Sequence, residues 1–148
     1  MKELYDFIGS LADILQIKIP DLRVIPAYAM EDICGSDTMA AYDRSTKIIF
    51  IEEKAEYTIE DFYIVAHEMR HAWQDIVDPF YYFEDYNDPT GHEYHVSNAE
   101  IDANAFACVA IAIIFNKVTT RTYKNDKIAQ KKYEKRLQQL NKQYEVVF

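Results

Sequence analysis

The sequence predicts an α+β fold for residues 1–148, and three observations support this. Apolar side chains follow helical spacing near the N-terminus, residues typical of strands flank a turn at 43–46, and a long apolar stretch follows residue 97. With 49% hydrophobic residues and only 3 Gly among 148, the chain can bury a sizeable core. No repeat or linker divides it, so we expect a single domain.

The N-terminal third is expected to hold one helix and a small sheet. Residues 2–16 should form an amphipathic helix, because their apolar positions are spaced three and four apart. Residues 21–27 have the pattern of a short strand. Residues 40–42 and 47–52, joined by the turn at 43–46, have the pattern of a hairpin.

The middle of the chain predicts a helix that starts near residue 58 and ends before the Asp78-Pro79 pair. It contains an H-E-x-x-H pentad at 67–71. Positions four apart lie on one helix face, so His67 and His71 can present two imidazole nitrogens to a single metal ion. Glu68 would then lie near a water bound to that metal. Two neutral nitrogen ligands with an adjacent carboxylate base are typical of zinc-dependent hydrolysis.

A third ligand must come from outside the pentad, and Glu100 is the best candidate. It lies near the start of a second helix, expected from Ser97 to about residue 117. Ser97-x-x-Glu100 is also a capping box, in which the carboxylate would turn back to the Ser97 N–H group. In that case Asp102 becomes the ligand. Asn104, one turn after Glu100, can hydrogen-bond a ligating histidine and fix its tautomer.

The stretch 98–107, Asn-Ala-Glu-Ile-Asp-Ala-Asn-Ala-Phe-Ala, follows the pentad helix and together with it resembles the ImmA/IrrE family of intracellular metallopeptidases. The resemblance covers about a third of the chain. The family usually has Gly at the position of Arg70, whose charged end is expected to reach solvent along its aliphatic stem, and Glu at that of Asp102. The resemblance implies a small zincin-like domain, with a short twisted sheet packed on the metal-binding helix and a core helix, and N- and C-terminal helices. Zinc would be bound by His67, His71 and Glu100.

The resemblance further implies an endopeptidase that acts on a peptide or protein substrate. Glu68 would serve as general base towards a water activated by zinc. An edge strand would take the peptide by strand addition, and the candidates are the strand at 48–51 or its hairpin partner around 39–42. One alternative is a catalytically silent zinc-binding regulatory or interaction protein on the same scaffold. Another is a small α+β interaction protein without metal.

Residues 79–96 are predicted to be a long, aromatic-rich connection, which is unusual in a compact domain. Tyr94 or His95 within it could donate a hydrogen bond to the oxyanion of the reaction. The alternative is that both are ordinary polar residues of a loop. From residue 125 onward, apolar positions at 4-3-4 spacing predict a C-terminal helix with one packing stripe.

Charge is unevenly spread along the chain. The formal net charge is −9, yet residues 117–148 carry nine Lys or Arg against three Asp or Glu, so residues 1–116 carry −15. The acidic body disfavours nucleic acid as a partner. The basic tail is expected to solvate a helix face or to pair with the body, with phosphate binding as the alternative.

The remaining features predict a cytoplasmic protein without a membrane partner. Two cysteines, Cys34 and Cys108, cannot form a disulfide framework, and Cys108 should be buried in the apolar helix. Acidic residues near the N-terminus argue against a signal peptide. The longest apolar run, residues 105–115, is too short to span a bilayer. The sequence does not indicate an oligomeric state.

Overall fold

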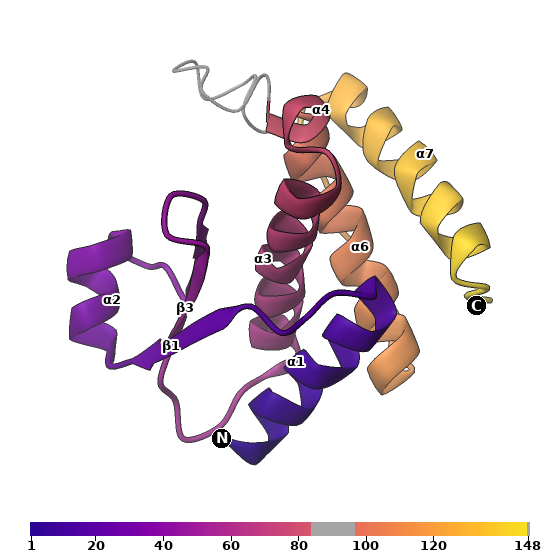
Figure 1. Ribbon diagram of the computed structural model, residues 1–148. Coiled ribbons are helices and arrows are strands. Elements are labelled where there is room, and N and C mark those ends of the chain that lie inside the picture. The colour runs from indigo at the N-terminus through magenta and orange to yellow at the C-terminus, as the bar shows by residue number, and fades with distance from the viewer. Residues whose placement is uncertain (84–96, 148) are drawn as a thin grey trace. The chain divides into compact units, whose positions relative to one another are not determined.

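The computed structural model describes residues 1–83 and 97–147 (Figure 1). The described residues form six helices and a three-stranded sheet, which confirms the α+β prediction. They group into a first unit, Met1–Trp73, and a second unit, Gln74–Phe148, and each is described by itself. The expectation of a single domain stays a prediction.

The sheet of the first unit has the strand order β1-β3-β2. Strand β1 (Asp21–Ile25) pairs with β3 (Ile48–Glu52) in parallel, and β2 (Ala40–Asp43) pairs with β3 antiparallel, as the predicted hairpin requires. Strand β3 is therefore central, and the suggestion that 48–51 is an edge strand was wrong. Sequence periodicity shows the hairpin but not the parallel pairing of β1 on the other side of β3. The alternative candidate, the hairpin partner β2, is an edge of the sheet that the described residues form.

Helix α2 (Ala27–Cys34) was not predicted from the sequence. It is eight residues long and has Pro26 at its N-cap. Only Met30 is buried, so the apolar periodicity that predicts a helix is weak in this stretch. It connects β1 to the hairpin and contacts β3. A parallel pair needs a crossover of this kind, because its strands must run in the same direction.

Helix α1 (Lys2–Leu15) confirms the predicted amphipathic helix. It ends at Gln16, whose left-handed conformation lets its amide bond back to the carbonyls of Ala12 and Asp13. Its buried side chains include Phe7, whose ring lies 4.7 Å from that of Phe62 on α3. This contact joins α1 to the helix that carries the pentad.

Helix α3 (Ile59–Val77) has the predicted bounds, and its last residues belong to the second unit. A reciprocal pair of bonds starts it: Thr58 N donates to Asp61 Oδ2 at 2.9 Å, and Asp61 N donates to Thr58 Oγ1 at 3.2 Å. Lys54 Nζ donates to the other carboxylate oxygen at 2.9 Å. The start of α3 is thus fixed by side chains, as in a capping box.

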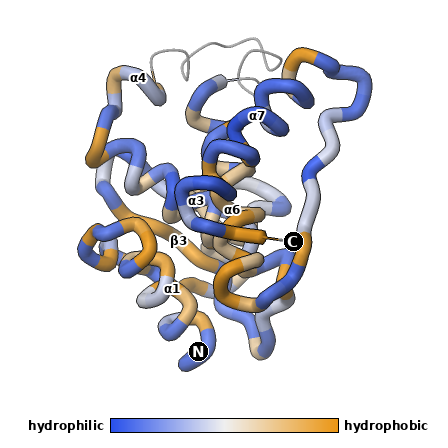
Figure 2. The backbone as a smooth tube through the Cα atoms, turned by 90° about the vertical axis from the view of Figure 1, so that its right-hand side faces the viewer, coloured by the Kyte–Doolittle hydropathy of each residue, from blue (hydrophilic) through white to orange (hydrophobic). Residues whose placement is uncertain are grey.

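The second unit contains α4 (Pro79–Phe83), α6 (Asn98–Phe115) and α7 (Lys127–Gln143). The connection expected over 79–96 therefore begins as a short helix. Helix α7 packs on α6, and Figure 2 shows α7 as mostly hydrophilic. Tyr133 and Leu140 of its predicted stripe are buried, and the Tyr133 hydroxyl lies 3.0 Å from Cys108 Sγ. Cys108 is buried as predicted.

Helix α6 forms the core of the second unit, with thirteen buried residues from Ala99 to Ile111. Among the described residues it is the only helix long and apolar enough to cross a membrane, but 72% of it is buried in the protein. A core helix of a soluble protein has the same composition, and the burial favours that interpretation.

Candidate metal centre

The two histidines of the pentad face one another on α3. Their Nε2 atoms are 3.0 Å apart, and the rings meet edge to face, with centroids 4.6 Å apart and an interplanar angle of 89°. One potential ligand atom from each of His67, Glu68 and His71 lies within 4.8 Å of the other two. The helical spacing predicted this cluster, and the structure places the three side chains together.

The nitrogen pair has the separation that a tetrahedral zinc ion requires. Zinc–nitrogen bonds of about 2.0–2.1 Å at tetrahedral angles put two ligand nitrogens about 3.3 Å apart. The observed distance between the two Nε2 atoms is 3.0 Å, and a small rotation of either ring would bring it to this value. His71 is only 3% exposed, whereas His67 is half-buried, so solvent reaches the pair from the side of His67. The donor set therefore fits zinc.

Glu68 is held by the backbone of the edge strand. Its Oε2 atom accepts a hydrogen bond of 2.9 Å from the Tyr42 N–H group. Strand β2 has β3 as its only neighbour in the described sheet, so this amide points away from the ladder. The carboxylate is half-buried, and one of its oxygens is thus fixed in position while the side chain stays accessible to solvent.

Arg70 does not reach solvent, and the prediction that it would was wrong. The residue is 1% exposed, and its guanidinium carbon lies 3.7 Å from the centroid of the Trp73 ring. Trp73 is three positions later and therefore lies on the same helix face. The guanidinium is stabilised by the face of this ring, which the spacing of the two residues could have indicated.

Cys34, at the end of α2, lies in the electrostatic surroundings of the pentad. Partial burial raises the pKa of its thiol, and the charges of Glu68 and Asp43 raise it further. A raised pKa favours the protonated thiol, whereas the thiolate is the form that binds metals. Without a metal, the surroundings of Cys34 therefore favour the thiol, which is not the form that binds a metal.

Glu100 and Asp102 lie on α6 in the second unit, and both are buried. Ser97 Oγ accepts a bond of 3.3 Å from the Glu100 N–H group. This half of the capping box uses the backbone of Glu100 and not its carboxylate. Both oxygens of Asp102 are bonded: Oδ2 accepts from Gln74 at 2.8 Å and Oδ1 from Arg136 at 2.7 Å.

The other predicted participants have different outcomes. Asn104 donates to the hydroxyl of Tyr123 at 2.9 Å, and its bond to a ligating histidine stays a prediction. Tyr94 and His95 lie outside the described residues. Sequence reasoning did not identify Tyr42, because its contribution is a backbone amide that any residue type offers. Nor did it identify Arg136 as the partner of Asp102, since the two are 34 positions apart.

Compared with family models, with curated proteins and with solved structures, the chain matches none of them. The resemblance to the ImmA/IrrE family stays a prediction from the two motifs. The features that point to a function are therefore the donor set of α3 and the chemistry of its neighbours.

Proposed function

We propose that this protein is a zinc-dependent peptidase, an endopeptidase that hydrolyses a peptide or protein substrate. The observation that carries the proposal is the cluster on α3. Two Nε2 atoms are 3.0 Å apart, and the Glu68 carboxylate lies in the same group of potential ligands. Zinc sites of hydrolases combine such a nitrogen pair with a carboxylate base beside it.

Glu100 is the proposed third ligand. The bond between Ser97 and Glu100 uses only the backbone of Glu100, so this bond does not occupy the carboxylate. Asp102 is the weaker candidate, because Gln74 and Arg136 already bond both of its oxygens. Its release would separate the buried Asp102 carboxylate from the half-buried Arg136 guanidinium, at a cost that binding of a metal would have to offset.

Bound to this set, zinc would supply Lewis acidity that polarises a peptide carbonyl and makes a water molecule nucleophilic near neutral pH. His67 and His71 must be neutral to bind it. Glu68 would accept the proton of the attacking water and then deliver it to the leaving amine. The hydrogen bond from the Tyr42 N–H group holds one carboxylate oxygen of Glu68. It thereby fixes the direction of the other oxygen, which would accept the proton. Tyr94 and His95 are the proposed donors to the oxyanion.

The wider setting follows from the same proposal. A small zincin-like fold of the ImmA/IrrE type would place the sheet beside the metal-binding helix, with β2 as the edge that takes a peptide. Such a protein would act in the cytoplasm. The alternative function, a zinc-binding regulatory protein without turnover, uses the same ligands and differs only in what Glu68 does.

The proposal is tested by metal content and by cleavage, measured on the same preparations. Plasma mass spectrometry should find about one zinc per chain in the wild type and in Glu68→Gln, and none in His71→Ala or Glu100→Ala. Cleavage of a random peptide library, followed by mass spectrometry, should fall by about a thousandfold in Glu68→Gln.

Glu60→Gln is the matched control, since Glu60 lies in the first turn of α3 away from the cluster. It should keep both zinc and cleavage. If the wild type binds zinc but cleaves no faster than Glu68→Gln, the protein is the silent zinc-binding alternative. Failure to take up zinc after its addition would contradict both functions.

A further inference from the structure

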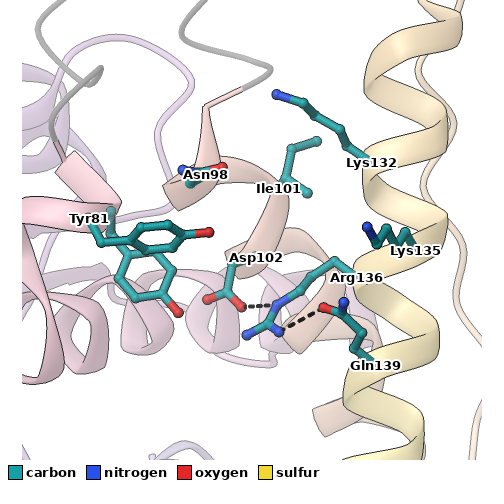
Figure 3. A pocket seen from close by; sticks show the side chains of 9 residues that line it. Tyr81, Asn98, Ile101, Asp102, Lys132, Lys135, Arg136 and Gln139 are labelled. Carbon is teal, nitrogen blue, oxygen red and sulfur yellow. Dashed lines mark hydrogen bonds and ion pairs between the residues drawn. The ribbon is translucent and has the colours of Figure 1, made fainter.

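A groove in the second unit combines positive charge with aromatic rings (Figure 3). It lies among α4, α6 and α7 and has a volume of about 400 Å³. Small-molecule sites usually have volumes of about 300–1,000 Å³. The groove is therefore large enough for a ligand of modest size, and all of its described lining belongs to the second unit.

Helix α7 supplies three cations to this groove: Lys132, Lys135 and Arg136. They stand at i, i+3 and i+4 and so share one helix face, as the close-up shows. Like charges at this spacing repel one another. Asp102 is the one carboxylate among the described residues that line the groove. The formal charge of these lining residues is therefore +2, in a protein whose net charge is −9. A concave site of this sign concentrates anions.

Arg136 is held in position by a buried carboxylate. Its Nε atom donates to Asp102 Oδ1 at 2.7 Å, and its Nη1 atom donates to Gln139 Oε1 at 3.1 Å. The side chain of Asp102 is 4% exposed, and Gln74 fixes its second oxygen. The guanidinium is thus oriented before any ligand arrives, which reduces the entropy lost on binding an anion.

The opposite wall of the groove is aromatic. Tyr81 and Tyr82 of α4 have ring centroids 4.9 Å apart at an interplanar angle of 81°. Tyr82 is 8% exposed and firmly packed, whereas Tyr81 is 54% exposed and presents its ring at the groove. A planar ligand can stack on an exposed tyrosine ring, and the phenolic hydroxyls can donate hydrogen bonds.

From these observations we infer that the groove binds a small organic anion with a planar ring, of the nucleoside-phosphate class. The phosphate would lie against Lys132, Lys135 and Arg136, and the ring against Tyr81. Arginine and lysine are the side chains that bind phosphate, and aromatic rings stack on bases of any type. This function goes beyond the proposed peptidase and does not depend on the metal cluster.

The test is a binding measurement by calorimetry on the full chain in the presence of EDTA, so that zinc has no part in it. The probes are AMP, inorganic phosphate and adenosine. We expect AMP to bind more tightly than either of its parts, and its affinity to fall as ionic strength rises. Lys135→Gln should weaken AMP binding about threefold to tenfold, because it removes one partly exposed charge contact.

Two matched controls separate the site from general effects of charge and hydrophobicity. Lys131→Gln removes an exposed cation of α7 outside the groove and should leave the affinity unchanged. Tyr81→Leu should weaken AMP about fivefold and Tyr81→Phe should not, while Phe80→Leu, at an exposed neighbour outside the groove, should have no effect.

Several outcomes would overturn the inference. The inference is wrong if no probe binds, or if AMP and inorganic phosphate bind with equal affinity. It is also wrong if Lys135→Gln and Lys131→Gln lose the same amount of affinity for AMP. Circular dichroism of each variant shows whether it is folded. Because EDTA is present throughout, a failure here leaves the metal proposal untouched, and a failure of the zinc assay leaves this inference untouched.

Discussion

Two buried helices, α3 and α6, both carry polar side chains, but they use them in opposite ways. On α3, His67 and His71 direct the same kind of atom at each other, 3.0 Å apart. On α6, Asp102 is bonded by complementary groups from other parts of the second unit. The two nitrogens on α3 lie within hydrogen-bond distance of each other and could also share a cation when both rings are neutral, whereas the oxygens of Asp102 accept from an amide and a guanidinium. A pair of like ligand atoms on one helix face can thus be distinguished from a carboxylate that is bonded by complementary donors.

The largest effect on stability is expected where the partners are already in place. Arg136→Ala should lower the free energy of unfolding by about 2–3 kcal/mol, because it removes a charged donor from the buried Asp102 carboxylate. Urea denaturation measures this. The exposed Lys131→Ala should stay within about 0.5 kcal/mol of the wild type. Equal effects of the two substitutions would mean that the pair of Asp102 and Arg136 contributes no more than an exposed side chain.

Zinc should stabilise the protein only through its proposed ligands His67, His71 and Glu100. At a free zinc concentration a hundredfold above Kd, the wild type should gain about 2.7 kcal/mol of unfolding free energy. His71→Ala should gain nothing, and Asp102→Asn should gain as much as the wild type relative to its own metal-free form. Thermal denaturation with and without zinc measures each gain. A loss of the gain in Asp102→Asn would make Asp102 the third ligand instead of Glu100.

A smaller effect concerns the start of α3, the helix that carries the pentad. Thr58→Ala removes the hydroxyl that accepts from Asp61 N, and should cost about 1 kcal/mol of stability. Thr58→Ser keeps the hydroxyl and should cost much less. Urea denaturation of the two variants distinguishes loss of the cap from loss of the methyl group. A similar cost for both would mean that the hydroxyl contributes little.

The smallest effect should be a dependence on pH that arises at Asp61. Burial raises the pKa of this carboxyl, but hydrogen bonds from Thr58 and Lys54 outweigh burial, so its pKa lies below the ordinary value. Its contribution to stability is present above the unfolded-state pKa of about 3.9 and is lost as pH falls through the folded pKa. Unfolding free energies of the wild type and Asp61→Asn should therefore converge as the solution is acidified. Parallel curves would contradict this.

Local patterns predicted most of the secondary structure and the part of the site that lies within one helix. The ends of α3 and the meeting of His67 with His71 follow from spacing along the chain. The burial of Arg70 and the pairing of Asp102 with Arg136 do not, because both depend on tertiary packing. Helix α2 was missed for a related reason: it is held by the crossover between parallel strands and has little periodicity of its own.

The bond between Tyr42 and Glu68 has a consequence for how the molecules behave in crowded solution. An edge strand offers unpaired amides to which the strand of another molecule can add, and this is a common route to aggregation. Glu68 occupies one such amide of β2 and places a carboxylate beside it. Replacement of this side chain by alanine would expose the amide and remove the charge. The same glutamate therefore leaves one amide fewer on this edge to which the strand of another molecule could add.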